Sequence, residues 1–334
     1  MYRCAWLLRL ILAFGLIAEA LFCQAQSASQ AADYQRTIAR VQLNLVKREV
    51  GYQGRFSRTE SLAKTEQYRQ ELVASGESAS KKLLSLPEFQ AHMTLRAIAL
   101  RVAQAQTQVF AVNYKHVNDL SIYEGNSLEA RRAYYAAFDA ALHKTVVLND
   151  SLRAARQYFA DEFNLLLDNQ EMRVIDQWLS VQHRIADLFR YQHQVILPVV
   201  RVRTSMTTLI KAVGSADIPS FEKSRRLLVA EVATAKSELA VVPDFINLDV
   251  LYRNAGRELV HVYGELCTNE LAHILTLLKE NAQPTSAQME AVNQNLADFT
   301  AKLNAANLAY EEAGKAFFKS YRPVLDEDNR HSGY

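Results

Sequence analysis

The chain has 334 residues, of which 49% are hydrophobic and 22% charged, and this balance excludes an intrinsically disordered protein. Only 10 Gly and 6 Pro are present, too few for the many turns of a β-sandwich or barrel, whereas residues that favour helices dominate. The formal net charge of +2 gives no electrostatic reason to expect a nucleic-acid partner.

The first 25 residues have the organisation of a secretory signal peptide. Arg3 and Arg9 flank a basic start, Leu10 to Ala18 is an apolar core too short to span a bilayer comfortably, and Cys23-Gln24-Ala25 supplies small residues for a signal peptidase. We therefore predict cleavage and export to the periplasm. Two alternatives stay open: an uncleaved anchor helix, and a lipid anchor on Cys23, although Phe22 stands where that processing requires a small residue.

Amphipathic helices are predicted along the rest of the chain. The first runs from Gln30 to Val50 and is ended by Gly51 and Gly54. A polar second helix starts at a capping box formed by Ser57 and Glu60, and continues to about Ser75. Residues 76–80, which begin with a Gly, are expected to form a connector of small residues.

The next helix start is predicted at Ser85-Leu86-Pro87-Glu88, because Ser can cap, Pro suits a first turn and Glu stands three places on. That helix should extend to about Leu120. The sequence Tyr123-Glu124-Gly125-Asn126 breaks it, and Asn126 with Glu129 opens a further helix. Asn149 or Asp150 can cap a continuation of this helix to about Leu166.

Helical periodicity continues through the second half of the chain. Asp168 caps the next helix, and Pro198 predicts a kink or a break in it. Residues 214–219 form a loop, after which Ser220 with Glu222 starts another helix. One long helix is expected from about Asp249 to Lys279.

The most regular pattern lies in residues 286–321, where apolar residues recur in sevens. One row consists of Met289, Leu296, Leu303, Tyr310 and Phe317, and the row three places on consists of Val292, Phe299, Ala306 and Ala313. This spacing predicts a single apolar seam along one helix face, covered by other helices of the same chain.

These elements predict an all-α fold, an elongated bundle of long antiparallel amphipathic helices. The bundle is expected to span residues 30–322, with a possible subdivision near Gly214. A polar tail, residues 323–334, should follow. After signal cleavage no apolar stretch is long enough for a membrane span.

Two Glu-x-x-His pairs have the spacing of ligands in di-iron helical bundles. Helix geometry places Glu258, His261 and Glu265 on the face opposite the apolar residues, so this pair should face solvent. Glu270 and His273 lie nearer the apolar boundary and are the candidate metal ligands, although no matching pair occurs on another helix. Surface polar residues are the simpler interpretation.

The remaining residues that could carry chemistry, a His–Asp pair and a cysteine, are better explained by structural roles. His183 and Asp187 are four apart and can meet within a solvated charge network. Cys267 falls on the apolar side of its helix, which favours a small buried hydrophobe over a nucleophile. No nucleophile elbow, Cys-x-x-Cys or His-Glu-x-x-His motif occurs, so no catalytic residue is predicted.

Four tyrosines, Tyr114, Tyr123, Tyr134 and Tyr135, cluster in sequence around the break at Gly125 and are candidates for a partner-binding surface. The alternative is that they are bundle-edge residues with wet hydroxyl groups.

A family resemblance covers about a third of the chain, from Ala79 to Leu188. A long helix ends in Tyr123-Glu124-Gly125-Asn126, and a Tyr-bearing helix, Ala130 to Leu142, follows. This arrangement resembles a helical domain of unknown function found in exported bacterial lipoproteins. The resemblance implies an envelope location and no known reaction.

A signal peptide, amphipathic helices and no convergent catalytic set favour an exported non-enzymatic protein that binds another macromolecule in the bacterial envelope, as a scaffold or as an inhibitor or immunity-type partner. The alternative is a helical bundle that binds a metal or small ligand, at Glu270 and His273. We expect a protein partner, no nucleic acid and no cofactor. The pattern leaves the oligomeric state open.

Overall fold

The computed structural model describes residues 2–55, 61–89, 94–166, 170–214, 217–246, 250–280 and 285–331. Across these residues every regular element is helical and no strand forms, which confirms the predicted all-α fold class. None of the helices in these ranges has an apolar stretch long enough to cross a bilayer.

The chain divides into two compact units. Unit 1 comprises Met1–His116, Ala140–Ile185 and Glu327–Tyr334, and unit 2 comprises Val117–Asp139 and Ala186–Asp326. The possible subdivision near Gly214 does not coincide with a boundary between these two units, because Gly214 lies inside unit 2. The second half of α6 (Gln170–Gly214) packs with helices that follow it, so the chain cannot be divided at that loop.

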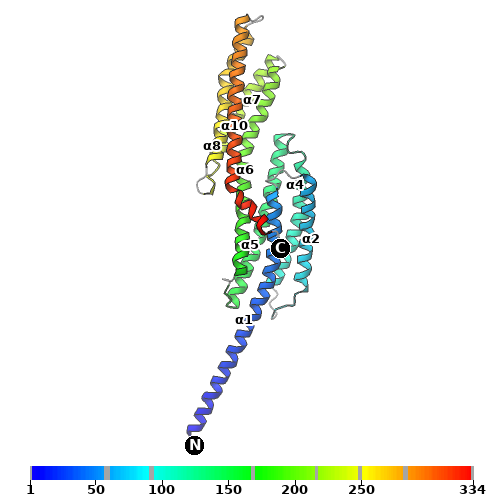
Figure 1. The fold of residues 1–334 in the computed structure, drawn as a ribbon, viewed down its shortest axis with the longest axis vertical. Helices are drawn as coiled ribbons and strands as arrows, with labels where there is room; N and C mark the ends of the chain where they lie inside the picture. The colour runs from blue at the N-terminus through cyan, green and yellow to red at the C-terminus, as the bar shows by residue number, and fades with distance from the viewer. Residues whose placement is uncertain are drawn as a thin grey trace. The chain divides into compact units, whose positions relative to one another are not determined.

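Unit 1 is built on α1 (Tyr2–Arg55), α2 (Leu62–Ser85) and α3 (Thr94–Gln108), with the second half of α5 (Leu128–Glu162) and the first half of α6. α2 packs against α1 and α3, as can be followed in Figure 1. The hydrophobic core of unit 1 contains the side chains of Ile38, Leu45, Leu83, Leu95, Val102, Leu152 and Phe159. A π segment, η1 (Val109–Asn113), joins α3 to α4 (Tyr114–Ser121).

Glycine was misread as a helix terminator in α1 and α2. α1 continues through Gly51 and Gly54, and both are buried. Gly76 lies inside α2, where a Cβ atom would stand 2.2 Å from the Oγ1 of Thr107 on α3. The missing side chain allows close helix packing there, so the predicted connector at residues 76–80 is wrong.

The predicted helix start at Ser85 is also wrong, because Ser85 is the last residue of α2. Leu86 has extended backbone angles (φ −70°, ψ 133°), as expected for a residue that precedes a proline. α2 itself begins after Ser61, whose Oγ accepts a hydrogen bond from the Lys64 N–H. The predicted caps at Ser57 with Glu60 and at Asp168 fall outside the described residues.

The turn at residues 123–126 is confirmed, and α5 starts just after it, where Ser127 Oγ accepts from the Ala130 N–H. Of the kink or break predicted at Pro198, the break is wrong, because α6 is continuous through the proline. Val195, Val199 and Val202 are all buried around this proline, and their packing holds the helix together at the missing backbone hydrogen bond.

Unit 2 contains the rest of α6 with α7 (Ile218–Ala240), α8 (Leu251–Thr268), α9 (Glu270–Glu280) and most of α10 (Ser286–His331). α7 packs against both α8 and α9. It is capped by Asp217 rather than Ser220, with Pro219 in its first turn. The single long helix expected over residues 249–279 is two helices that separate at Asn269.

The heptad seam of α10 is covered by unit 2. Phe299, Tyr310 and Phe317 are buried, the other members are half-buried, and only Met289 is exposed. Tyr310 stacks on Tyr252 of α8 with ring centroids 5.3 Å apart, and Figure 1 shows the two helices side by side. The prediction that the seam is satisfied within the chain is therefore confirmed. α10 continues to His331, so the tail expected from residue 323 is helical over its described part.

Candidate functional site

The four candidate tyrosines do not form one surface. Tyr114 belongs to unit 1 and is fully buried, with its hydroxyl 3.2 Å from Gln53 Nε2, so its assignment as a partner-binding residue is wrong. Tyr123 is exposed in the turn of unit 2. Tyr134 and Tyr135 are half-buried in α5, and burial raises the pKa of Tyr135 to about 12.

Tyr135 is held by intramolecular contacts in unit 2. Its ring stacks on His193 with 3.9 Å between ring centroids, and the His193 Nδ1 lies 2.8 Å from Asp139 Oδ1. Phe138 contacts the same imidazole edge-on. These contacts account for Tyr135 as a packing residue and leave Tyr123 as the accessible member of the predicted set.

The two candidate metal ligands, Glu270 and His273, lie on α9 in different surroundings. Glu270 forms an ion pair with Lys302 of α10, and His273 is exposed. Within the described ranges no three His, Cys, Asp or Glu side chains are grouped as a metal site would require. Glu258, His261 and Glu265 are exposed, as helix geometry predicted.

Two further expectations have clear outcomes. His183 pairs with Asp150 of α5 at 3.0 Å and Asp187 pairs with Arg190, all through partly exposed side chains. These pairs agree with the predicted solvated charge network, although His183 and Asp187 pair with other residues rather than with each other. Cys267 is fully buried, and burial raises the pKa of its thiol to about 11. A buried neutral thiol is a poor nucleophile, which agrees with the predicted packing role.

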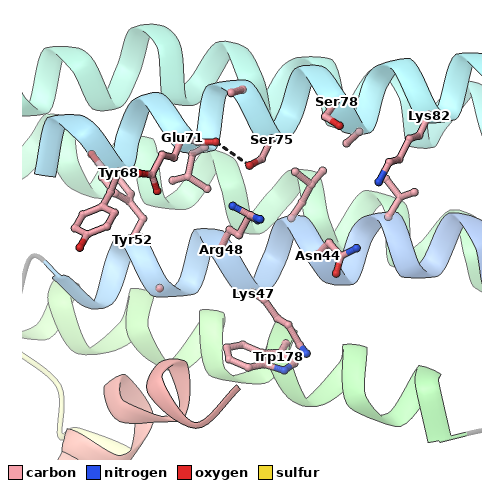
Figure 2. Close-up of a pocket in the computed structure, with 16 residues that line it drawn as sticks. Asn44, Lys47, Arg48, Tyr52, Tyr68, Glu71, Ser75, Ser78, Lys82 and Trp178 are labelled. Atoms are coloured by element: carbon pink, nitrogen blue, oxygen red, sulfur yellow. Dashed lines mark hydrogen bonds between the residues drawn. The ribbon is translucent and has the colours of Figure 1, made fainter. Parts of the chain in front are cut away.

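A groove of about 770 Å³ lies between α1 and α2. The residues that line it all belong to unit 1, and they include Trp178 of α6, which Figure 2 shows next to Lys47. Leu45, Leu72 and Ala79 form a buried apolar floor. The stretch of α1 that lines the groove, residues 41–52, is about 16 Å long at 1.5 Å per residue.

The polar lining of the groove carries three cations and one carboxylate. Figure 2 shows Arg48 of α1 and Lys82 of α2 extending into the same space from opposite walls. Both are exposed, and neither forms an ion pair with any residue that the structure describes. Lys47 lies over the Trp178 ring at 5.8 Å from its centroid. Glu71 is the carboxylate, on α2.

Small side chains on α2 keep this groove open. Ala74, Ser75 and Ser78 line it, and Ser75 Oγ donates to the backbone oxygen of Glu71. Sequence reasoning missed the site because it read Gly76 to Ser80 as a connector between helices. The sequence did contain a signal for this site. Small residues, Ala74, Ser75 and Ser78, occur within one helix, and the two cations Lys47 and Arg48 are adjacent in another.

A buried polar network lies in unit 1, on residues next to those of the groove. Glu49 is fully buried beside Arg48 in α1 and accepts hydrogen bonds from Asn149 Nδ2 at 3.0 Å and Gln106 Nε2 at 3.4 Å. Burial raises the pKa of Glu49 to about 7, and the polar contacts of Thr145, Asn149 and Gln182 oppose part of that rise. The network therefore joins α1, α3, α5 and α6.

Comparison of the chain with protein-family models, with curated proteins and with solved structures finds no match. The resemblance to a helical domain of exported bacterial lipoproteins therefore stays a prediction.

Proposed function

We propose that this chain is an exported, non-enzymatic binding protein whose groove in unit 1 receives an acidic segment of a protein partner in the bacterial envelope. The observation that carries the proposal is the pair Arg48 and Lys82, two cations on facing walls without an ion-pair partner among the described residues. Export rests on the signal pattern of residues 1–25, and cleavage there leaves the groove residues in place.

The dimensions of the groove support a segment of chain as the ligand. A length of about 16 Å matches about five residues in extended form at 3.3 Å each. The apolar floor can hold aliphatic side-chain stems while the rim cations pair with carboxylates. Arg48 supplies a planar guanidinium, which binds a carboxylate through two parallel hydrogen bonds.

The alternative of a metal or small-ligand site at Glu270 and His273 has no supporting observation. The Glu270 carboxylate is already paired with Lys302. We therefore do not extend the proposal to that part of α9.

A fluorescent hexaglutamate peptide tests the groove directly by fluorescence anisotropy. We expect Lys82→Glu to weaken binding by about tenfold, because one favourable charge contact becomes repulsive. Lys81→Glu is the matched control, since Lys81 is an exposed neighbour on α2 that does not line the groove. An equal loss in both variants, or no binding by the wild type, contradicts the proposed ligand.

A native partner is then sought in envelope extract. The expected result is a protein captured by the wild type and by Lys81→Glu, absent with Lys82→Glu, and released by free hexaglutamate. Capture that is indifferent to Lys82→Glu would place the partner elsewhere on the chain and overturn the role of the groove.

A further inference from the structure

Glu49 is a fully buried carboxylate, and within the described residues its hydrogen-bond donors are uncharged amides rather than cations. Its Oε2 accepts from Asn149 Nδ2 and Gln106 Nε2, and its Oε1 accepts from Gln53 Nε2 at 3.4 Å. Three amide donors compensate part of the cost of burying a negative charge, but they supply no opposite charge. A proton is the simplest group that would neutralise this carboxylate.

Gln53 is placed to respond to that proton. Its Nε2 lies within 3.4 Å of three oxygen atoms, those of Glu49 Oε1, Tyr114 Oη and Thr145 Oγ1, whereas its own Oε1 is buried without a hydrogen-bond partner in the described structure. Rotation of the amide by half a turn would point Oε1 at the same three atoms. In that orientation it accepts from the Tyr114 hydroxyl and from a protonated Glu49.

We propose that Glu49 is a proton-binding site, and that its protonation switches the Gln53 side chain from hydrogen-bond donor to acceptor. Among the described residues, Tyr114 is the titratable group that interacts with both members of this pair, and Tyr52 in turn acts on Tyr114. The elements α3, α5 and α6 contribute the uncharged side chains of Gln106, Thr145, Asn149 and Gln182. Burial is the main cause that raises the pKa of Tyr114 well above its ordinary value, so this hydroxyl keeps its proton.

The proton site is also coupled to the groove, and this second step rests on the proposed function. Glu49 stands between Arg48 and Gly51 in α1, both of which line the groove, and Tyr52 belongs to both regions. An anion held by Arg48 repels an ionised Glu49 and therefore favours proton uptake. By reciprocity, protonation of Glu49 strengthens anion binding, so affinity rises as the pH falls.

The proton site itself is tested without any ligand. The full chain is labelled with ¹³C at the glutamate carboxyl carbons, and the carboxyl signal missing from Glu49→Gln is followed from pH 4.5 to 9 by NMR. We expect this signal to titrate at about two pH units above the other glutamates. A Glu49 signal that titrates together with the exposed glutamates overturns the proposal.

A second variant keeps the test decisive if Glu49→Gln fails to fold. Asn149→Ala removes one donor to the Glu49 carboxylate and leaves the carboxyl group in place. Loss of that donor disfavours the charged form, so the Glu49 titration should move to higher pH. A titration that stays where it is, or moves to lower pH, contradicts the network that we describe.

The coupling is tested with the hexaglutamate peptide at pH 6 and pH 8 by calorimetry. We expect wild-type affinity to be about fivefold higher at pH 6, with proton uptake on binding, and Glu49→Gln to lose this difference. Glu71→Gln, which removes the exposed carboxylate of the groove, should retain it. Equal pH dependence in the wild type and Glu49→Gln overturns the coupling. Absence of peptide binding at both pH values overturns the acidic ligand, whereas the NMR titration still decides the proton site.

Discussion

The side chain of Glu49 shows how far an environment can move one residue from its ordinary chemistry. It follows Arg48 in α1, yet Arg48 is exposed in a groove whereas Glu49 is fully buried among amides. Adjacent helical residues point about 100° apart, so one faces the groove and the other faces α3 and α5. One turn further along, Tyr52 lines the groove but is itself buried, and Gln53 belongs to the buried network.

Burial of Glu49 makes the stability of the protein depend on pH. Because burial raises its folded pKa from 4.5 to about 7, the folded state holds this proton to higher pH than the unfolded state. The group therefore stabilises the fold fully below about pH 4.5, and that contribution is lost as the pH rises through 7.

The expected loss is about 3 kcal/mol of unfolding free energy between pH 4.5 and 7.5. Urea unfolding of the wild type and Glu49→Gln at both pH values measures it, since other titrations cancel in the comparison. The advantage of the wild type over the variant should shrink by that amount. A difference between the two proteins that is independent of pH would contradict a buried titrating carboxylate.

At the scale of elements, helix contacts are set by where small residues stand. Gly76 permits α2 to approach α3 at Thr107, and Gly314 of α10 lies where a Cβ would stand 3.2 Å from Tyr252 of α8. Each is inside a helix, where glycine lowers intrinsic helix stability. At each position the glycine leaves room for a side chain of the neighbouring helix, and this packing compensates for that loss.

Gly76→Ala is therefore expected to destabilise the protein, although alanine is the better helix former by about 1 kcal/mol. The added methyl group would overlap Thr107 Oγ1, which is held by a 2.8 Å hydrogen bond to the Ala103 carbonyl oxygen. We expect a loss of about 1–3 kcal/mol by chemical denaturation.

Thr107→Ala provides the control for this contact. In the Thr107→Ala background the same glycine substitution meets no hydroxyl, so its cost should fall by about 1 kcal/mol or more. If the two substitutions have strictly additive effects, the contact between α2 and α3 at this position is not the cause of the loss.

At the scale of the whole molecule, the two units are assembled from discontinuous stretches of chain. α6 contributes residues up to Ile185 to unit 1 and the remainder to unit 2. In unit 2, Arg201 of α6 pairs with Glu231 at 3.0 Å and with Glu238 at 2.7 Å, both on α7. Val195 and Val199 lie against Gly256 of α8. The loop after Gly214 therefore joins elements of one unit.

A chain cut at that loop should not yield two independent proteins. Residues 217–331 alone lack the α6 surface that covers α7 and α8, so we expect helical circular dichroism without a cooperative thermal transition. Co-expression with residues 30–214 should restore cooperativity. Cooperative unfolding of the C-terminal piece by itself would show that the sequence-based division near Gly214 was correct.

Composition and periodicity by themselves determined the helical class and the covered seam of α10. Both depend on properties that each segment carries alone: few glycines and prolines, strong helix formers, and apolar residues every seven positions. The turn at residues 123–126 was found for the same reason, because its breakers act on neighbouring residues.

Only the tertiary structure decided whether a particular glycine or proline ends a helix, and whether a particular charged group is buried or exposed. Gly51, Gly76 and Pro198 look like boundaries in the sequence, yet each lies inside a helix. At Gly76 the reason is the close approach of Thr107 on α3. The groove and the raised pKa of Glu49 likewise depend on which distant segments lie opposite. A side chain is buried only when another segment of the chain covers it, and the covering segment is often far away in the sequence.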